Sequence, residues 1–571
     1  MLKHKSFTVF FLLLLSLALF LSWRKEQIPE NFVVTGNSRI TMCGSFFLAD
    51  TAYLPIQLHD GLGDLHFGIS TNNQQAQRFF NQGLRLVYAF NHIEALRSFK
   101  EASRIDPGCP MAYWGQALAL GPNLNDWNPK DREKMALEAL DHAKKLKLYA
   151  SPVELDFIHA MAARFNGKAY DNRDSLNTSY RIAMSKLAKK YPDHPEALTL
   201  YSDAIMTSIA WDYWERNGTP KELTKEAVVI LEKALFKFPS HPGAHHLYIH
   251  LVEASPNPAA ALKSAVFLEN AMPKAGHIVH MPSHIYARVG NYSKSISANI
   301  QAVKVDEEFL ATSDDQGMYR LGYYPHNIDF IGFSAYMNGQ SEKAIQATAK
   351  LAYRIKGFES FAPMYYGYYL PEPLNAFVRF GKWNEILSLP VPEERYLQPL
   401  VMGRFARGLA FLRNGKVFEA KNELKKLDSL NRLDTLKTMY AFYNSLGQIS
   451  NVATCLLRGE ILLSEKKIDE GIKMLKLGVA AEDDFRYNEP PDWRLPVRHY
   501  LGAALLESGK YAEAEKVFQE DLIKNPENGW ALQGLLQSQL KQNKTIEMSA
   551  TAKRFTIAWK DADLTIASSR F

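Results

Sequence analysis

The sequence predicts an all-α protein, an α-α superhelix built from repeated pairs of antiparallel helices. Apolar residues recur with helical spacing through most of the chain, and the alternating pattern of a strand is rare. A set of small residues, an aromatic residue and a closing proline also returns several times. At 571 residues the chain is too long for one compact core, so a repetitive architecture accounts for its length.

One repeating unit occupies residues 74–107, with Gly83, Ala95, Phe99 and Pro107 at its marker positions. Small residues let two helices approach closely, and the proline ends the second helix. The pattern resembles a tetratricopeptide (TPR) repeat. The same pattern of small residues returns in residues 225–242, 330–347, 405–424 and, most clearly, 499–526. The resemblance implies a TPR solenoid of roughly a dozen helical pairs, with looser matches in 114–183 and 361–400 that predict inserted loops.

The N-terminus has the layout of an export signal. Basic Lys3 and Lys5 precede an uncharged apolar run over residues 7–23, which Arg24 and Lys25 follow. No small-x-small cleavage site follows, so we expect residues 1–25 to form an uncleaved membrane anchor rather than a cleaved signal peptide. We expect a tether or irregular N-terminal cap over 26–72 and the helical solenoid over 73–560. The basic start favours a solenoid on the non-cytoplasmic side.

Charge and cysteine content exclude some functions. Lys and Arg number 67 against 61 Asp and Glu, a formal net charge of +6, and no basic run suits phosphate binding. Nucleic acid is therefore not an expected partner. The three cysteines show no CxxC spacing, which argues against a zinc ribbon or a full disulfide framework and favours buried free thiols.

The histidines suggest chemistry. Half of the 16 histidines lie between residues 241 and 326. In TPR proteins the second, fifth, ninth and twelfth places of a unit face the concave groove, and His246, His250 and Glu253 take the fifth, ninth and twelfth places here. The corresponding inner places of the next two units hold His277, His280, His284, His326 and Asp329.

These residue types are metal ligands. Residues three or four apart share one helical face, so His246, His250 and Glu253 can converge as the two-histidine, one-carboxylate set of zinc hydrolases and non-haem iron enzymes. His277, His280 and His284 could form a second, all-imidazole set suited to zinc or copper. One shared centre and two neighbouring centres both remain open. So do an anionic ligand held by protonated imidazoles and a purely structural network. Pro282 breaks the helix locally and leaves a loop position open for His277 and His280.

Other groove residues are weaker candidates. Trp114 and His499 fall where a ligand could be contacted, although a packing role for Trp114 and a structural role for His499 are the favoured interpretations. The acidic, proline-interrupted segment 482–493 reads as a solvated cap.

Several longer segments, including HMPSHIYARVGNY and EPPDWRLPVRHYLGAALLESGKYAEAEKVF, look like a group of exported bacterial TPR proteins. The resemblance implies a location in the bacterial periplasm or envelope and transfers no catalytic residue. We expect a membrane-tethered or exported scaffold that binds a partner protein or peptide in its groove, with a zinc, copper or iron site on its inner helices. The alternative is a metal-dependent oxidoreductase or hydrolase that uses the same histidines. Common enzyme motifs such as HExxH, a phosphate loop or a dinucleotide fingerprint are absent from the sequence.

Overall fold

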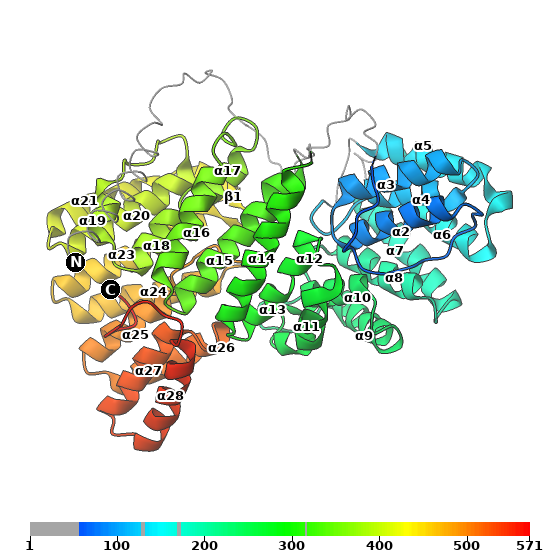
Figure 1. The fold of residues 1–571 in the computed structure, drawn as a ribbon. Helices are drawn as coiled ribbons and strands as arrows, with labels where there is room; N and C mark the ends of the chain where they lie inside the picture. Colours follow the sequence, from blue (N-terminus) through cyan, green and yellow to red (C-terminus); the bar gives the residue numbers. More distant parts are fainter. Residues whose placement is uncertain (1–55, 127–131, 168–172, 314–316) are drawn as a thin grey trace, which may run out of the picture. The chain divides into compact units, whose positions relative to one another are not determined.

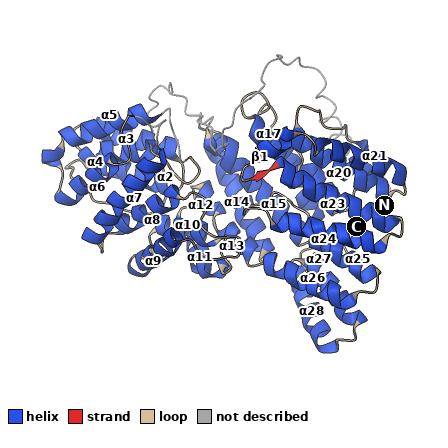
Figure 2. Cartoon of the chain, turned by 180° about the vertical axis from the view of Figure 1, so that it is seen from behind, coloured by secondary structure: helices blue, strands red, loops and turns tan. Residues whose placement is uncertain are grey.

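The computed structural model describes residues 56–126, 132–167, 173–313 and 317–571. These residues are almost entirely helical (Figure 2). The predicted anchor, residues 1–25, lies outside the described residues, as does Cys43. Within the described ranges, none of the helices combines the length and apolar character needed to span a membrane. Cys109 and Cys455 are buried free thiols, as the sequence predicts for these two.

Helices follow one another along the chain in packed pairs (Figure 1). The first pairs are formed by α2 (Gln74–Tyr88) with α3 (His92–Ile105), α4 (Pro110–Leu120) with α5 (Glu133–Lys145), α6 (Pro152–Ala162) with α7 (Arg173–Lys190), α8 (Pro195–Ser208) with α9 (Glu222–Lys237), and α10 (Pro242–Val252) with α11 (Leu262–Ala271). Next, α12 (Gly276–His280) and α13 (Pro282–Arg288) together pack on α14 (Tyr292–Leu310).

The second half repeats this arrangement. Its pairs are α15 (Tyr324–Met337) with α16 (Ser341–Arg354), α18 (Glu372–Arg379) with α19 (Trp383–Ser388), α20 (Leu397–Arg413) with α21 (Val417–Leu430), α23 (Leu446–Ser464) with α24 (Ile468–Asp483), α25 (Val497–Glu507) with α26 (Tyr511–Lys524), and α27 (Gly529–Lys541) with α28 (Thr545–Ala558). Extra short elements are α17 (Pro363–Tyr369), α22 (Asp434–Thr438) and the antiparallel strands β1 (Tyr440–Ala441) and β2 (Asn444–Ser445). The prediction of an all-α chain of stacked helical pairs that resemble TPR units is confirmed.

Glycines explain why the repeat pattern folds as it does. A Cβ on Gly83 of α2 would lie 2.7 Å from the ring of Phe99 on α3, and a Cβ on Gly115 of α4 would clash with the same ring. The aromatic residue of a second helix therefore fits between glycines of its own first helix and the next one. Gly502 and Gly534 hold Phe518 of α26 in the same way. This close approach is what the small residues of the pattern allow.

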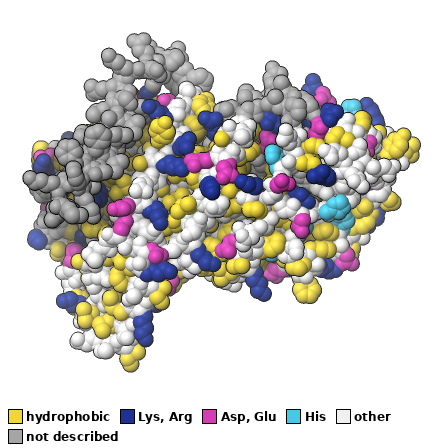
Figure 3. Space-filling view, in the orientation of Figure 1, with side chains coloured by type: hydrophobic (Ala, Val, Ile, Leu, Met, Phe, Trp, Pro, Cys, Tyr) yellow, Lys and Arg dark blue, Asp and Glu magenta, His cyan; other side chains and the backbone are white. Residues whose placement is uncertain are grey.

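Residues 56–72 carry no helix and pack as an irregular cap on the first pair. Leu62 and Phe67 are buried, and the side-chain amide of Gln77 donates to the Phe67 carbonyl. Beyond this cap the apolar core forms two clusters, one reaching from Leu62 to Tyr323 and one from Ala287 to Leu535. On the surface seen in Figure 3, Lys and Arg side chains are interspersed with Asp and Glu.

Candidate metal centre

Four neighbouring helices bring six of the predicted histidines together. Helix α10 carries His246 and His250 on successive turns, and α15 carries His326 in its first turn. The remaining three come from α12, with His277 and His280, and α13, with His284.

Pro282 shapes this part of the site. It occupies the first position of α13, where its missing N–H leaves no helical hydrogen bond unmade. His277 and His280 consequently stay helical, on α12, and the alternative loop position is wrong. At the start of α12, a Cβ on Gly276 would collide with the side chain of Asp306, so only glycine lets α12 pack this closely on α14.

The histidines form compact sets of possible ligands. One set is His246, His250 and His277, a second is His280, His284 and His326, and a third is His250, Glu253 and His284; within each set the ligand atoms lie within 4.8 Å of one another. All of these residues are buried except His326, which is half-buried. Because their rings touch in a continuous chain, with His246 and His277 centroids 4.9 Å apart and His280 and His284 centroids 4.6 Å apart, the sets are adjacent.

Hydrogen bonds to oxygen acceptors hold Nδ1 of His246 and Nδ1 of His280. His246 Nδ1 donates to the Tyr88 carbonyl at 2.6 Å, and His246 Nε2 is buried with no partner among the described residues. His280 Nδ1 donates to Asn299 Oδ1 at 2.6 Å, while Asn299 Nδ2 donates to the Ser295 carbonyl. Metal-binding histidines are characteristically held by such an acceptor on the second ring nitrogen. The tautomer of His246 therefore presents an unpaired Nε2 lone pair, whereas His280 Nε2 lies 2.7 Å from His284 Nε2 and accepts a hydrogen bond from it.

Two carboxylates contact the ring of His284 and shift its pKa. Glu253 Oε2 lies 2.8 Å from His284 Nδ1, and Glu489 contacts the same nitrogen. Burial alone would lower the pKa of His284, but these two charges override it and raise that pKa to about 10. Glu253 Oε1 also lies 3.3 Å from His250 Nδ1, so this carboxylate links the two histidine sets.

Burial keeps the other imidazoles neutral. It lowers the pKa of His246, His250, His277, His280 and His326 well below the ordinary histidine value, and neighbouring histidines add to the effect. Neutral imidazole is the form that ligates metals, so an ion at the second set would have to displace the proton that Glu253 and Glu489 hold on His284. His250 Nε2 and both ring nitrogens of His277 are buried and have no hydrogen-bond partner in the described part of the chain. Unpaired buried polar atoms are costly, so their concentration here is a sign of function.

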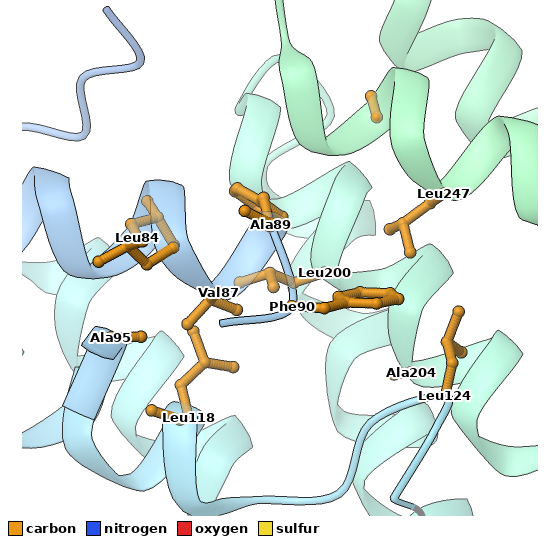
Figure 4. Close-up of a cluster of buried hydrophobic side chains, with 14 of the residues drawn as sticks. Leu84, Val87, Ala89, Phe90, Ala95, Leu118, Leu124, Leu200, Ala204 and Leu247 are labelled. Carbon is orange, nitrogen blue, oxygen red and sulfur yellow. The ribbon is translucent and has the colours of Figure 1, made fainter. Parts of the chain in front are cut away.

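Aromatic rings close the cluster. Phe90 packs with its centroid 4.4 Å from that of His246 and 5.2 Å from that of His277, and Figure 4 shows Phe90 close to Leu247 and Leu200. Phe90 has a φ of 57°, in the turn between α2 and α3, where a bulky residue is strained. Around the second set, the ring centroid of Phe330 lies 4.9–5.1 Å from the ring centroids of His280, His284 and His326. Such a shell excludes water from a metal site.

The segment after α24 brings Glu489 to the cluster. Arg494, which is 1% exposed in its side chain, bonds Asp329 of α15 at 2.6 Å and Glu372 of α18 at 3.2 Å. The prediction of a solvated cap for residues 482–493 is therefore wrong for its second half, because these buried ion pairs hold the segment inside. Sequence reasoning missed Glu489 and Phe90 as site residues, since neither lies near the histidines in the chain. Asp329, predicted in the groove, pairs with Arg494 here, and its role toward a ligand stays a prediction.

Trp114 and His499 lie apart from the three ligand sets. The indole of Trp114 packs on Phe80 and Phe157 and donates to the Phe157 carbonyl at 3.2 Å. His499 Nε2 lies 3.0 Å from Asp521 in the second core cluster. A ligand role stays a prediction for both residues.

No protein-family model matches the chain, and no curated protein does either. Among solved structures, a human IFIT1 dimer with m7Gppp-AAAA is 13% identical, with 86% of this chain and 91% of that chain covered and a TM-score of 0.30. The APC/C hetero-tetramer Cut9–Hcn1 is 11% identical over 86% and 95%, with a TM-score of 0.29. The P58(IPK) TPR domain is 14% identical over 82% and 99%, with a TM-score of 0.21. Similarities this low carry no information about the function of this chain.

Proposed function

We propose that the protein is a transition-metal protein whose histidine cluster binds two ions, one at His246, His250 and His277 and one at His280, His284 and His326. The observation that carries the proposal is the group of buried ring nitrogens that have no hydrogen-bond partner among the described residues, namely Nε2 of His246 and of His250 and both nitrogens of His277, beside a His246 Nδ1 that donates to the Tyr88 carbonyl. A hydrogen-bonded structural network would satisfy both nitrogens. Here the nitrogens of His277 have no partner among the described residues.

Two ions explain the position of Glu253 better than one. Its two oxygens face Nδ1 of His250, in the first set, and Nδ1 of His284, in the second. As an acceptor for both, Glu253 orients one ligand of each ion. As a ligand itself, Glu253 would form a single site with the Nδ1 atoms of the same two histidines and leave His246 and His277 without a role. We therefore assign Glu253 a positioning role in the proposed centre.

The donor set indicates the class of chemistry. Three imidazoles per ion suit zinc or copper, and three protein ligands leave a position open for a fourth, exogenous ligand. The cluster is buried rather than open to a groove. Both features favour a metal-dependent enzyme, an oxidoreductase or hydrolase, over a peptide-binding groove built on these histidines.

Protein binding is a second candidate function. Exposed apolar side chains recur on the second helices of several pairs, for example Phe236 on α9, Phe418 on α21 and Ile546 on α28. They offer contact points for a partner protein. The membrane-tethered or periplasmic location expected from residues 1–25 remains part of this proposal and is tested by fractionation of a bacterial host that expresses the full chain.

The metal proposal is tested by elemental analysis of the full chain, purified in detergent and reconstituted with zinc or copper. We expect two ions per chain, and one fewer after His246→Ala or His284→Ala. His245→Ala is the matched control, because His245 is a buried neighbour whose two nitrogens already bond Ser264 and the Pro239 carbonyl. It should keep both ions. Substoichiometric metal in the parent, or equal content in all four proteins, contradicts the proposal.

A further inference from the structure

The segment after α28, residues 559–571, contains no helix and crosses the first helices of several pairs; it is called the crossing segment below. In Figure 1 it leaves α28 and turns back over the second half of the chain. Its bonding partners lie on α20, α23, α25 and α27, and are Arg413, Glu460, His499, Glu507 and Gln537. One segment therefore contacts four successive first helices, which offer equivalent positions side by side in a repeat protein.

The crossing segment lies on these helices as an extended peptide does. Half-buried and exposed residues alternate along it. The half-buried ones are Ala562, Leu564, Ile566 and Ser568, and the exposed ones between them are Asp563, Thr565 and Ala567. This period of two is that of an extended chain with one face on a surface. The main chain of the segment is bound as well, because the Gln537 side-chain amide donates to the Ala567 carbonyl and Arg413 Nε donates to the Phe571 carbonyl at 2.9 Å. Peptide-binding proteins use main-chain bonds for affinity and side-chain contacts for specificity in this way.

Two carboxylates meet the arginine of the crossing segment. Arg570 Nε lies 3.4 Å from Glu460 Oε1, and Arg570 Nη2 lies 3.1 Å from Glu507 Oε2. The Glu460 side chain is 1% exposed. Burial alone would raise the pKa of Glu460, but Arg570 and Arg413 lower it, so this buried carboxylate is charged. The charge of Glu460 therefore favours a basic side chain at this place.

An aromatic contact follows directly after the arginine. The ring of Phe571 meets Trp530 of α27 edge-on, with centroids 5.7 Å apart, and a Cβ on Gly381 would lie 3.0 Å from Phe571. Beside it is an open hollow of about 660 Å³, lined by Phe380 and Lys382 among others. The surface is therefore larger than the segment that occupies it.

We propose that the surface under the crossing segment is a binding site for an extended peptide of another protein, which presents an arginine followed by an aromatic residue and displaces Arg570 and Phe571. The crossing segment then acts as the site's own occupant and closes it until a partner competes. The charge of Glu460 and Glu507 and the ring of Trp530 select this partner. The inference adds a second surface to the protein-binding candidate above and is independent of the metal ions.

Tethering determines how firmly the site is closed. A segment joined to its own site by a short connection acts at an effective concentration on the order of millimolar. A free peptide of the same sequence must exceed that concentration to replace it. Loss of the segment's own side-chain contacts should therefore open the site to a peptide added at micromolar concentration.

The test uses a fluorescent peptide of residues 561–571 and the full chain in detergent, with binding followed by fluorescence polarisation. The double variant Arg570→Ala, Phe571→Ala should bind the peptide at least about tenfold more tightly than the parent does. A peptide that carries the same two substitutions should show no such gain. Lys553→Ala, at an exposed position on α28, is the matched control and should bind the peptide as the parent does.

Two further variants locate the binding on this surface. Glu460→Gln, added to the double variant, removes the charge that meets the arginine and should weaken peptide binding at least about tenfold. Glu507→Ala keeps the test valid if Glu460→Gln does not fold, because Glu507 is 59% exposed; it should weaken binding about two- to fivefold.

Three results overturn the inference. The first is equal peptide affinity in the folded parent and the folded double variant. The second is loss of helical circular dichroism in the double variant, which would make the crossing segment a fixed part of the fold. The third is a dimer of the parent that the double variant does not form, which would assign the site to the crossing segment of a second copy. None of these results depends on metal content, so the metal proposal is tested separately.

Discussion

Arg494→Met is the substitution whose effect the structure predicts most directly. The guanidinium of Arg494 is buried and bonds Asp329 Oδ2 at 2.6 Å, Glu372 Oε1 at 3.2 Å and the Tyr368 hydroxyl at 3.3 Å. Methionine fills much of the same space but leaves the two carboxyls without their cation. Removing one partner of a buried ion pair destabilises a protein by about 3–5 kcal/mol, because an uncompensated charge stays behind.

The assay is urea denaturation of the metal-free full chain, followed by circular dichroism. Arg216→Met is the control, since the Arg216–Asp484 pair is more than half exposed, at 62% and 53%, and should contribute no more than about 1 kcal/mol. Adding Asp329→Asn and Glu372→Gln to Arg494→Met should recover most of the loss, because no buried charge then remains. If Arg494→Met costs no more than the control, the argument for a charged, paired Arg494 is refuted.

The same substitution has a consequence for the metal centre. Arg494 holds the segment that carries Glu489 to His284. We expect Arg494→Met to weaken metal binding about tenfold or more, the effect typical of a lost supporting group around a metal ligand. Competition with a chelator measures this affinity, and unchanged affinity would show that Glu489 needs no such anchoring.

Three further predictions concern pH, backbone strain and packing. Burial raises the pKa of Glu482 to about 8 from an ordinary 4.5, so the native state holds a proton that the unfolded chain has lost. The free energy of unfolding should therefore fall as the pH rises from about 4.5 to about 8, by at most about 5 kcal/mol. In Glu482→Gln this contribution should vanish from urea denaturation curves measured across that pH range. If the free energy of unfolding of Glu482→Gln depends on pH as steeply as that of the parent, the raised pKa of Glu482 is contradicted. Phe90→Gly should be about 1 kcal/mol more stable than Phe90→Ala, because only glycine adopts the φ of 57° without strain. Equal urea denaturation midpoints for the two variants would argue against backbone strain at this turn. Gly502→Ala should lower the free energy of unfolding by about 1–3 kcal/mol, since its Cβ would meet the ring of Phe518. Gly509 has a φ of 76° and open space around it, so Gly509→Ala measures the cost of backbone strain without such a clash.

Local pattern was sufficient for the helices and for part of the site. The spacing of Gly83, Ala95 and Phe99 predicts a close helix pair because it recurs in several units, and the structure shows the ring of Phe99 packed where a Cβ on Gly83 would lie. His246 and His250 are four residues apart, so any helix through them places both imidazoles on one face. The agreement extends over three consecutive repeats, because each repeat presents equivalent positions to its neighbours.

The remaining site residues depend on contacts between distant segments. Glu489 reaches His284 from 205 positions away, and Arg494 reaches Asp329 from 165. No periodicity links such residues, and a segment rich in acidic residues and prolines reads as solvated until its ion partners are known. Phe90 likewise occupies a turn where glycine is the usual choice, and only its packing on the imidazoles explains it. The sequence by itself determined the all-α repeat, the helical faces and the grouping of the histidines on inner helices. Tertiary structure alone decided which carboxylates contact these histidines and what surrounds them, because burial and charge pairing arise only when separate repeats pack together.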